Sequence, residues 1–142
     1  MEKYRIGFTT GVFDLFHIGH LNLLERCKEQ CKYLIVAVCD DKYVREIKKK
    51  EPVIPFEQRM RILSALKFVD EVVPISIEEV EDKMIPLKKY KFDVLFSGDD
   101  WKGTPRYNKT EEQFSEFGAK IVYLPYTTGI STTDLKEKIN KG

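Results

Sequence analysis

The only two histidines of the chain, His17 and His20, lie three residues apart in TTGVFDLFHIGHLNLLERC, at positions 9–27. Side chains at this spacing share one face of a helix, and the pattern predicts a helix start here, with Gly19 between the two rings. A helix N-terminus already favours phosphate through its free N–H groups and its dipole. Two imidazole donors would strengthen such an anion site, whereas the alternative is a pair of ordinary polar residues near a helix end.

A run of basic residues occurs in CDDKYVREIKKKEPVIPFEQR, at positions 39–59. It contains Lys42, Arg45, Lys48, Lys49, Lys50 and Arg59. Such a run is most often a solvated surface. If it lies at the same sheet edge as the histidines, its lysines would neutralise several phosphate charges at once, and a mobile loop would close over the ligand.

Two shorter stretches carry further polar groups. FSGDDWKG, at positions 96–103, combines Gly98, Asp99, Asp100, the only tryptophan, Trp101, and Gly103. This composition suits hydroxyl or metal binding, and it equally suits a turn held by Asx hydrogen bonds. GISTTDLK, at positions 129–136, places a glycine and three hydroxyls at another helix start. Those hydroxyls would form a second phosphate cradle, although N-capping alone accounts for one of them.

Other catalytic chemistries lack their motifs in this sequence. It contains no Ser-His-Asp, Cys-His, Walker A or GxGxxG pattern. Zinc is disfavoured because seven helical residues, a rise of about 10 Å, separate His20 from Cys27. Cys27, Cys31 and Cys39 lie in predicted helix and strand segments, which indicates buried, reduced thiols rather than disulfides. Positioning and electrostatic binding of a phosphate-rich ligand remain.

Apolar, β-rich segments alternate with helical periodicity along the chain, the pattern of parallel βαβ units with right-handed crossovers. Strands are predicted at 4–10, 33–39, 71–75, 93–97 and 120–124. Helices are predicted around the apolar stripe of Leu21, Leu24, Cys27 and Cys31, and at 56–66, 78–89, 110–117 and 131–140. Pro86 would interrupt the helix at 78–89, and a capping box from Thr110 to Gln113 would open the helix at 110–117.

The fold class that follows is α/β: a single Rossmann-like, doubly wound domain over residues 1–142, with about five parallel strands and helices on both faces. Ligands of such folds bind beyond the carboxyl ends of the strands. The candidate residues lie in the loops after Thr10, Cys39, Ser97 and Leu124, so the topology would bring them to one edge of the sheet.

Composition narrows the expected partners. Lys plus Arg total 24 against 23 for Asp plus Glu, a formal net charge of +1, so no overall field attracts nucleic acid or an anionic membrane. The sequence shows neither a signal peptide nor an apolar run of about 18 residues, and we expect a cytoplasmic protein with no nucleic-acid or membrane partner.

Four motifs, GVFDLFHIGH, FVDEVVP, GDDWKG and GISTTDLK, occur in this order over nearly the whole chain. Together they resemble the cytidylyltransferases, and most of all the glycerol-3-phosphate cytidylyltransferases of bacterial wall and capsule synthesis. The resemblance implies a Rossmann-like domain, usually a homodimer, in which the phosphate of a small phosphorylated alcohol attacks the α-phosphorus of CTP and pyrophosphate leaves. It also implies that Mg²⁺ is bound together with CTP.

The same resemblance implies roles for individual residues. His17 and His20 would stabilise the charge that develops on the α-phosphate. Lys48, Lys50 and Arg59 would reach the substrate phosphates, with Lys49 as the alternative under a one-residue shift. The nucleotide would be bound by Thr10, Gly11, Phe13, Asp14 (which shapes the turn), Gly19, Gly98, Asp100, Trp101, Gly129, Ile130, Ser131, Thr132 and Thr133. No residue is assigned as a metal ligand.

Two positions depart from the family pattern, since Lys67 before FVDEVV and Tyr126 in YTTGISTT stand where the family commonly has arginine. Lys67 keeps the charge but loses the bidentate fork, and Tyr126 loses the charge. The segment 104–120 is longer than in the nearest relatives, and we hypothesise that its Arg106 supplies the missing charge. Lys67, Arg106 and Tyr126 are therefore candidate substrate-binding residues.

The acceptor and the nucleotide leave alternatives open. Glycerol 3-phosphate is the leading acceptor, giving CDP-glycerol, with glycerol 2-phosphate, ribitol phosphate, phosphocholine and phosphoethanolamine behind it. An ATP-using adenylyltransferase is a rival, although Lys136 stands where those enzymes usually have arginine. A nucleotide-binding module without turnover is another. A tRNA synthetase fragment, suggested by the letters HIGH, would need a tRNA-binding domain and a KMSKS-like loop that the sequence lacks.

Overall fold

The computed structural model describes residues 3–125 and 132–141. The sequence-based assignments of Tyr126, Gly129, Ile130 and Ser131 lie outside the described residues.

One parallel sheet of five strands forms the centre of the protein. The strands are β1 (Tyr4–Gly11), β2 (Cys31–Cys39), β3 (Glu71–Ile75), β4 (Val94–Gly98) and β5 (Lys120–Leu124). They are arranged in the order β3-β2-β1-β4-β5, and every pair is parallel. The chain moves outward from β1 first in one direction and then in the other, so the order reverses between β1 and β4. This confirms the predicted doubly wound α/β fold, whose ligand crevice lies at that reversal.

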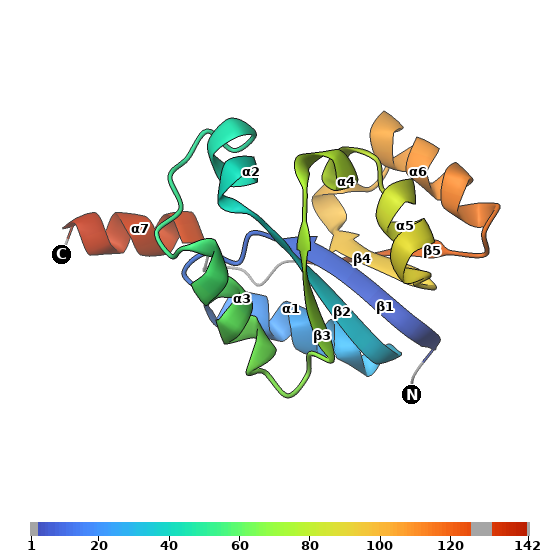
Figure 1. The fold of residues 1–142 in the computed structure, drawn as a ribbon, viewed down its shortest axis with the longest axis horizontal. Coiled ribbons are helices and arrows are strands. Elements are labelled where there is room, and N and C mark those ends of the chain that lie inside the picture. Colours follow the sequence, from blue (N-terminus) through green and yellow to red (C-terminus); the bar gives the residue numbers. More distant parts are fainter. Residues whose placement is uncertain (1–2, 126–131, 142) are drawn as a thin grey trace.

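Helices cover both faces of the sheet, and each face has its own core (Figure 1). Helices α1 (Ile18–Glu29) and α3 (Phe56–Ser64) pack on one face, around Leu24, Leu34 and Leu63. Helices α4 (Ile77–Glu81), α5 (Met84–Tyr90) and α6 (Pro105–Ser115) pack on the other, around Phe8, Leu87 and Phe114. Shorter elements are α2 (Asp41–Glu46) after β2 and a 3₁₀ helix, η1 (Asp99–Trp101), after β4; α7 (Thr132–Lys141) is the last helix.

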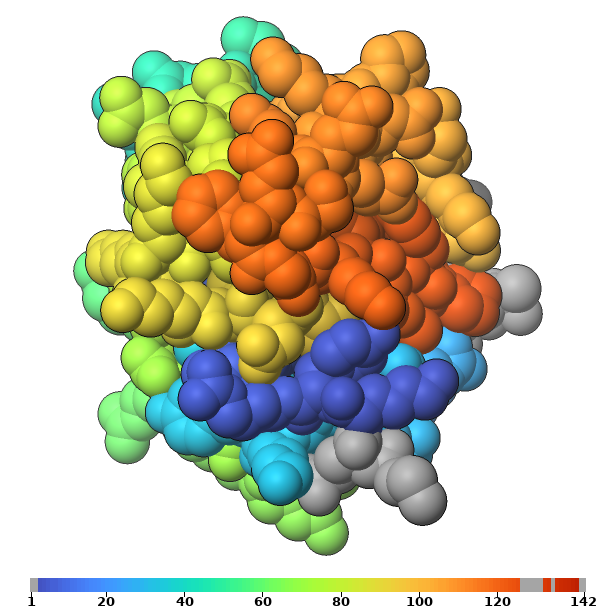
Figure 2. Space-filling model, turned by 90° about the vertical axis from the view of Figure 1, so that its right-hand side faces the viewer, coloured from blue at the N-terminus to red at the C-terminus, as the bar shows by residue number. Residues whose placement is uncertain are grey.

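Segments far apart in sequence meet beside α5 and α6. Figure 2 shows the first residues of β1 next to the α5–β4 region and to the α6–β5 region, which follows from the pairing of β1 with β4 and of β4 with β5. Within the part of the chain that the structure describes, no helix is long and apolar enough to span a bilayer.

The predicted strands are correct to within two residues, but the prediction for Cys31 is wrong. Helix α1 ends at Glu29 with Gln30 as its C-cap, and Cys31 begins β2. Both Cys27 and Cys31 are fully buried, and the Cys31 thiol donates to the Cys27 carbonyl at 3.3 Å. Cys31 lies four positions after Cys27 and therefore continues the helical periodicity of the sequence, although it belongs to a strand.

The predicted boundaries of two helices are also wrong. Helix α6 begins at Pro105, because the Thr104 hydroxyl caps the Tyr107 N–H, and Thr110 lies inside the helix with its hydroxyl donating to the Arg106 carbonyl. The helix predicted at 78–89 is two helices, since the chain breaks before Met84. Pro86 does not interrupt the second of these, because it lies in the first turn, where no N–H is required.

Candidate active site

A cavity of about 420 Å³ opens at the carboxyl ends of the central strands. The strands contribute Thr9, Thr10, Gly11, Cys39, Leu95, Phe96, Ser97 and Gly98. The surrounding loops and helices contribute Val12, Phe13, His20, Leu23, Tyr43, Ile47, Lys48, Val80, Lys83, Trp101, Arg106 and Tyr107. A second cavity of about 220 Å³ adjoins it, sharing Val12, Phe13, His20 and Lys48. The cavities therefore lie where a doubly wound sheet binds its ligands.

The loop after β1 makes a tight turn that positions the histidines. Phe13 and Leu15 have φ values of 56° and 49°, in the left-handed region that non-glycine residues rarely adopt. Asp14 lies between them and is 5% exposed. The turn ends at His17, which is the N-cap of α1.

The two histidine rings are fixed by a capping box. The Gly19 N–H donates to His17 Nδ1 at 3.0 Å, and the His17 N–H donates to His20 Nδ1 at 3.2 Å. The rings stack with their centroids 3.8 Å apart. Because Nδ1 of each ring accepts a hydrogen bond, the neutral form of each ring carries its proton on Nε2. Both imidazoles are therefore held as Nε2–H donors.

Burial keeps these rings neutral. It lowers the pKa of His20 to about 4, with the neighbouring His17 acting in the same direction, and it lowers the pKa of His17 as well. His20 lines both cavities. At neutral pH the pair would thus bind an anion as hydrogen-bond donors, and positive charge must come from other residues.

The lysine loop, defined here as residues 47–55, supplies part of that charge. Lys48 lines both cavities and Lys50 lines the second. Lys49 lines neither, and its φ of 56° marks a sharp turn between the other two. Of the three lysines that the sequence left open, Lys48 and Lys50 therefore line the cavities, and their contact with phosphate stays a prediction.

Asp14 ties the turn to two other segments. Its carboxylate accepts from the N–H groups of Val53 at 2.8 Å and Ile54 at 2.9 Å, both in the lysine loop. Its carbonyl accepts from the Thr132 hydroxyl at 2.7 Å, and Lys136 of α7 lies 3.8 Å from its carboxylate. Thr132, Thr133 and Lys136 line the second cavity. Asp14 therefore connects the turn to the lysine loop and to α7. The sequence analysis did not identify Val53, Ile54 and Lys136 as its partners.

The structure does not place Arg59 at the predicted phosphate cluster. The residue is 1% exposed, and its guanidinium donates to the carbonyls of Ile54, Val12 and Cys39 and to the Asp41 carboxylate. A guanidinium with these partners has little capacity left for a ligand. Arg59 instead joins the lysine loop, the β1 loop and the end of β2, so it supports the site without lining it.

Four other predicted residues, Lys67, Asp100, Gly19 and His17, line neither cavity. Lys67 precedes β3, at the opposite edge of the sheet from the strand carboxyl ends, and its amino group lies 5.7 Å from the centre of the Phe68 ring. The structure therefore places Lys67 away from both cavities, and its contact with a substrate stays a prediction. Asp100 is exposed in η1 beside Trp101, which does line the larger cavity, and Gly19 contributes through its bond to His17.

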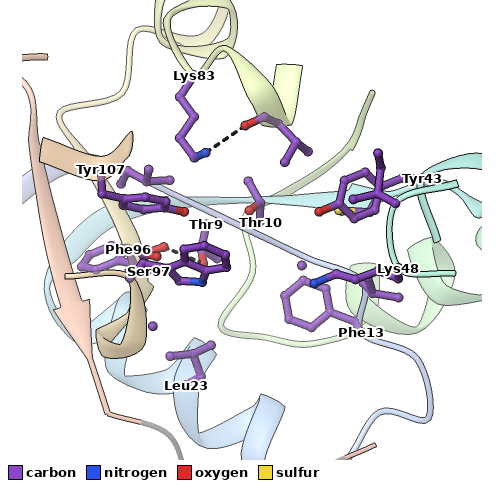
Figure 3. Close-up of a pocket in the computed structure, with 18 of the residues that line it drawn as sticks. Thr9, Thr10, Phe13, Leu23, Tyr43, Lys48, Lys83, Phe96, Ser97 and Tyr107 are labelled. Carbon is purple, nitrogen blue, oxygen red and sulfur yellow. Dashed lines mark hydrogen bonds between the residues drawn. The ribbon is translucent and has the colours of Figure 1, made fainter. Parts of the chain in front are cut away.

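The side of the larger cavity covered by α4, α5 and α6 is lined by Tyr43, Val80, Lys83, Arg106 and Tyr107. Lys83 is 8% exposed, and its amino group donates to the Val80 carbonyl at 2.8 Å. Figure 3 shows Lys83, with this hydrogen bond dashed, on the opposite side of Thr10 from Leu23 of α1. Burial, with the nearby Arg106 charge, lowers the pKa of Lys83 to about 8.

Sequence reasoning identified Arg106 as a residue of this region and missed Lys83. Lys83 lies within the segment predicted as a continuous helix, where a lysine is usually on the solvated face. The break before α5 makes Lys83 the N-cap residue of that helix and turns its side chain inward. The break itself, marked by Asp82 and the proline three residues after Lys83, was the available signal.

Metal ligands and reactive thiols are not gathered at this site. Residues 3–125 and 132–141 contain no group of three or more His, Cys, Asp and Glu side chains that could hold a metal ion. Burial raises the pKa of the Cys39 thiol to about 12 and raises that of Cys27 further, so both are protonated. The chemistry available is that of hydrogen-bond donors and ammonium groups around an anion.

Comparisons with known proteins cover almost the same residues. The family model described as Cytidylyltransferase-like matches residues 8–138. The glycerol-3-phosphate cytidylyltransferase of Bacillus subtilis (strain 168) is 40% identical over 131 residues, 92% of this chain and 94% of that protein. The protein of the same name from Staphylococcus aureus (strain NCTC 8325 / PS 47) is 36% identical over 131 residues, 92% of each chain. A solved structure, the lipopolysaccharide core biosynthesis protein from Thermoplasma volcanium GSS1, is similar with a TM-score of 0.73 and 27% identity, over 87% of this chain and 98% of that one.

Proposed function

Given that the chain belongs to the cytidylyltransferase-like family, we propose that it transfers the cytidylyl group of CTP to glycerol 3-phosphate, giving CDP-glycerol and pyrophosphate. The enzyme class, a nucleotidyltransferase, follows from the family and from relatives at 36–40% identity. The observation that carries the proposal is the pair of neutral Nε2–H donors at the start of α1, of which His20 lines both cavities together with Lys48.

The reaction is a displacement at phosphorus. An oxygen of the glycerol 3-phosphate phosphate forms a bond to the α-phosphorus of CTP, and the bond from that phosphorus to the oxygen bridging to the β-phosphate breaks. Pyrophosphate leaves with the electron pair. The attacking phosphate oxygen is already anionic, so no residue has to remove a proton from it. Catalysis then rests on orientation and on stabilising the charge that develops on the α-phosphate.

The residues of the site suit that task. His17 and His20 would donate Nε2–H bonds to the α-phosphate oxygens, and the capping box holds them in place before the reaction begins. Lys48 and Lys50 would neutralise the phosphates that leave as pyrophosphate. Asp14 would contribute indirectly, because it holds the lysine loop and the start of α7 against the histidine turn.

The nucleotide would lie toward the second cavity and α7. Thr132 and Thr133 line that cavity at the start of α7, where a helix N-terminus favours phosphate. Gly98 and Trp101 line the larger cavity beyond β4 and would face the nucleoside. We propose CTP rather than ATP as the nucleotide because the relatives are named as cytidylyltransferases.

Mg²⁺ accompanies the triphosphate in nucleotidyltransferases generally, and we propose the same here. The described residues do not form a dedicated carboxylate cage for it, which fits an ion held mainly by triphosphate oxygens and water. Its contribution would be to offset phosphate charge. The homodimer, the cytoplasmic location and the wall or capsule pathway stay predictions.

A pyrophosphate-release assay tests the proposal. CTP, ATP, GTP and UTP are each paired with glycerol 3-phosphate, glycerol 2-phosphate, ribitol phosphate, phosphocholine and phosphoethanolamine, and each nucleotide alone is the control for hydrolysis. We expect release to require an acceptor and to be fastest for CTP with glycerol 3-phosphate. Release with ATP but not CTP, or no release with any pair, would reject the proposed function.

A further inference from the structure

Three aromatic rings pack against the imidazole of His20, the histidine that lines both cavities. The ring of His17 stacks on it with centroids 3.8 Å apart, and the ring of Phe16 stacks on it at 5.3 Å with an interplanar angle of 29°. The ring of Phe13 meets it edge-on, at 5.4 Å and 68°. Stacked and edge-to-face contacts at such separations are the favoured geometries of aromatic pairs. The orientation of His20 is therefore set by neighbouring side chains as well as by the capping box.

Phe13 is fixed by the backbone of the β1 loop. It is 5% exposed, and its ring lies against Gly11, where an added Cβ would come within 2.8 Å of a ring carbon. Phe13 also lines both cavities. Replacing it would therefore change contacts with a ligand together with the contact to His20.

Phe16 lines neither cavity, and its ring therefore reaches the site only through His20. It directly precedes His17, the N-cap of α1, and it packs against the core on the α1 face. An apolar residue at this position commonly forms a hydrophobic staple with the fourth residue of the helix, here Leu21. A staple would stabilise the helix, whereas the ring contact would act on His20 itself.

The packed rings also exclude water from His20. An aromatic face attracts a cation, so ring contact alone would favour the charged imidazolium. Burial outweighs this attraction, because it lowers the pKa of His20 to about 4. Among the charged neighbours, His17 lowers this pKa further and Asp14 of the β1 loop raises it. Cations of the lysine loop and of α7 line the second cavity with His20 and disfavour a further positive charge there: Lys48, Lys50 and Lys136.

The protonation state of His20 matters because of the hydrogen bond at Nδ1. This nitrogen accepts from the His17 N–H at 3.2 Å. A proton added to the neutral ring would go to Nδ1, and two donors would then face each other. The ring would have to leave its place in the capping box. Shielding from water therefore protects the orientation of the ring as well as its tautomer.

Building on the proposed function, we propose that Phe16 is a positioning residue for His20, because its ring holds the imidazole in the orientation that presents Nε2–H to the α-phosphate and keeps water away from it. Phe16 acts through His20 and touches no substrate. Its loss should therefore lower kcat more than it raises either KM, since the developing charge loses a well-placed donor while ground-state binding is kept.

Steady-state kinetics of Phe16→Ala and Phe16→Gln, with CTP and glycerol 3-phosphate varied separately, test the proposal. We expect kcat at about pH 8 to fall about tenfold or more in both variants, with each KM within about threefold of wild type. Phe16→Gln fills part of the space of the ring and admits water, so the test does not depend on the alanine variant alone. Phe16→Tyr keeps a flat ring and should retain kcat within about twofold of wild type.

An NMR titration of the two histidines separates positioning from a purely structural role. The pKa of His20 should be about 4 in the wild type. In Phe16→Ala and Phe16→Gln it should rise by about one unit or more toward the ordinary value of about 6.5, because water reaches the ring. His20 is neutral above its pKa, so the ratio of variant to wild-type kcat should fall as the pH decreases through about 6.

Leu21→Ala and Met60→Ala are the controls. Leu21 is the other half of the possible staple, and Met60 is a half-buried residue of the same core; neither lines a cavity. Both variants should melt at a lower temperature while kcat and the pKa of His20 stay at their wild-type values. A shift of the His20 pKa in Leu21→Ala as large as in Phe16→Ala would overturn the proposal, because loss of the staple would then be sufficient.

Two further results would also overturn it. One is a His20 pKa that stays within about half a unit of wild type in both Phe16→Ala and Phe16→Gln. The other is a kcat within about twofold of wild type in both. The titration needs no turnover, so it still tests the contact between Phe16 and His20 if no nucleotide supports pyrophosphate release and the proposed function fails. Release with an unchanged titration would reject the role of Phe16 alone.

Discussion

Replacing Asp14 with alanine should loosen the lysine loop and lower activity without removing any group that touches substrate in the proposed mechanism. The Asp14 carboxylate accepts from the N–H groups of Val53 and Ile54, 39 and 40 residues later in the chain, at 2.8 and 2.9 Å. Alanine leaves both N–H groups without this acceptor. Because Lys48 and Lys50 are in the same loop, their position over the cavities depends on that attachment.

The size of the effect follows from the two bonds. A hydrogen bond to a charged group contributes about 1.5–3 kcal/mol, so losing two at the lower value costs about 3 kcal/mol. That corresponds to about a hundredfold shift in the equilibrium between attached and detached loop. If the whole loss appears in global unfolding, the melting temperature of a chain of this size falls by roughly 10 °C. We expect kcat/KM to fall by at least about tenfold.

The assay combines thermal melting, pyrophosphate release and hydrogen exchange at the amides of Val53 and Ile54. Asp93→Ala is the matched control, since the Asp93 carboxylate also accepts from a distant N–H, that of Ile6 at 2.9 Å, but at the opposite edge of the sheet. The control should lose stability while keeping its KM values. An Asp14→Ala protein that melts within about 2 °C of wild type, with kcat/KM within about twofold, would refute the reasoning.

Three further predictions concern the histidines, the buried arginine and the buried lysine. His20→Ala should lower kcat by at least about 10²-fold, because a donor to the developing phosphate charge is lost. His20→Gln can still cap α1, so it should melt at the wild-type temperature while its kcat stays lowered. Wild-type turnover in both variants would contradict the role assigned to His20. Arg59→Met should lower the free energy of unfolding in urea by about 3–5 kcal/mol, because it leaves Asp41 and three carbonyls unpaired; a loss below about 1 kcal/mol would show that these bonds matter little. Lys83, with its pKa lowered to about 8, is charged below that pH and neutral above it. KM for glycerol 3-phosphate should therefore rise by up to about tenfold per pH unit above pH 8. A KM that stays constant up to pH 9.5 would contradict this prediction.

Other groups near Lys83 should not produce that pH profile. Burial raises the pKa of Cys39 to about 12 and that of Tyr43 above its ordinary value. Lys83→Arg keeps a charge at this position and should therefore abolish the rise in KM while preserving acceptor binding.

The sequence was sufficient to predict the sheet, because each strand is a short apolar segment and the buried strands read as continuous hydrophobic runs. Residues of β2 face alternate sides, with Leu34 in one core and Ile35 in the other. The histidine turn was predictable for a similar reason: residue type and spacing sufficed to place both rings at a helix start. Local sequence patterns were thus sufficient to predict both the sheet and the position of the two histidines.

The roles of residues that depend on tertiary contacts could not be predicted from local sequence patterns. Arg59 was predicted as a phosphate ligand from the resemblance, yet its donors are used by the nearby Ile54 carbonyl and by three acceptors 18 to 47 residues away. Lys83 was overlooked because only a break between two short helices turns it into the cavity. Lys67 was assigned to the site by resemblance, although it precedes β3 and lies at the amino ends of the strands, opposite the cavities. For Arg59 the partners Val12, Cys39 and Asp41 lie 47, 20 and 18 residues away, beyond the reach of a local sequence pattern.

Competition in a single mixture tests the central claim most directly. The enzyme is given equal concentrations of CTP, ATP, GTP and UTP with equal concentrations of glycerol 3-phosphate, glycerol 2-phosphate, ribitol phosphate, phosphocholine and phosphoethanolamine, and the products are identified by mass spectrometry at early times. The relative amounts report the ratios of kcat/KM for all pairs at once. CDP-glycerol derived from glycerol 3-phosphate should dominate; a dominant ADP-linked product, or CDP-choline or CDP-ethanolamine in its place, would contradict the account.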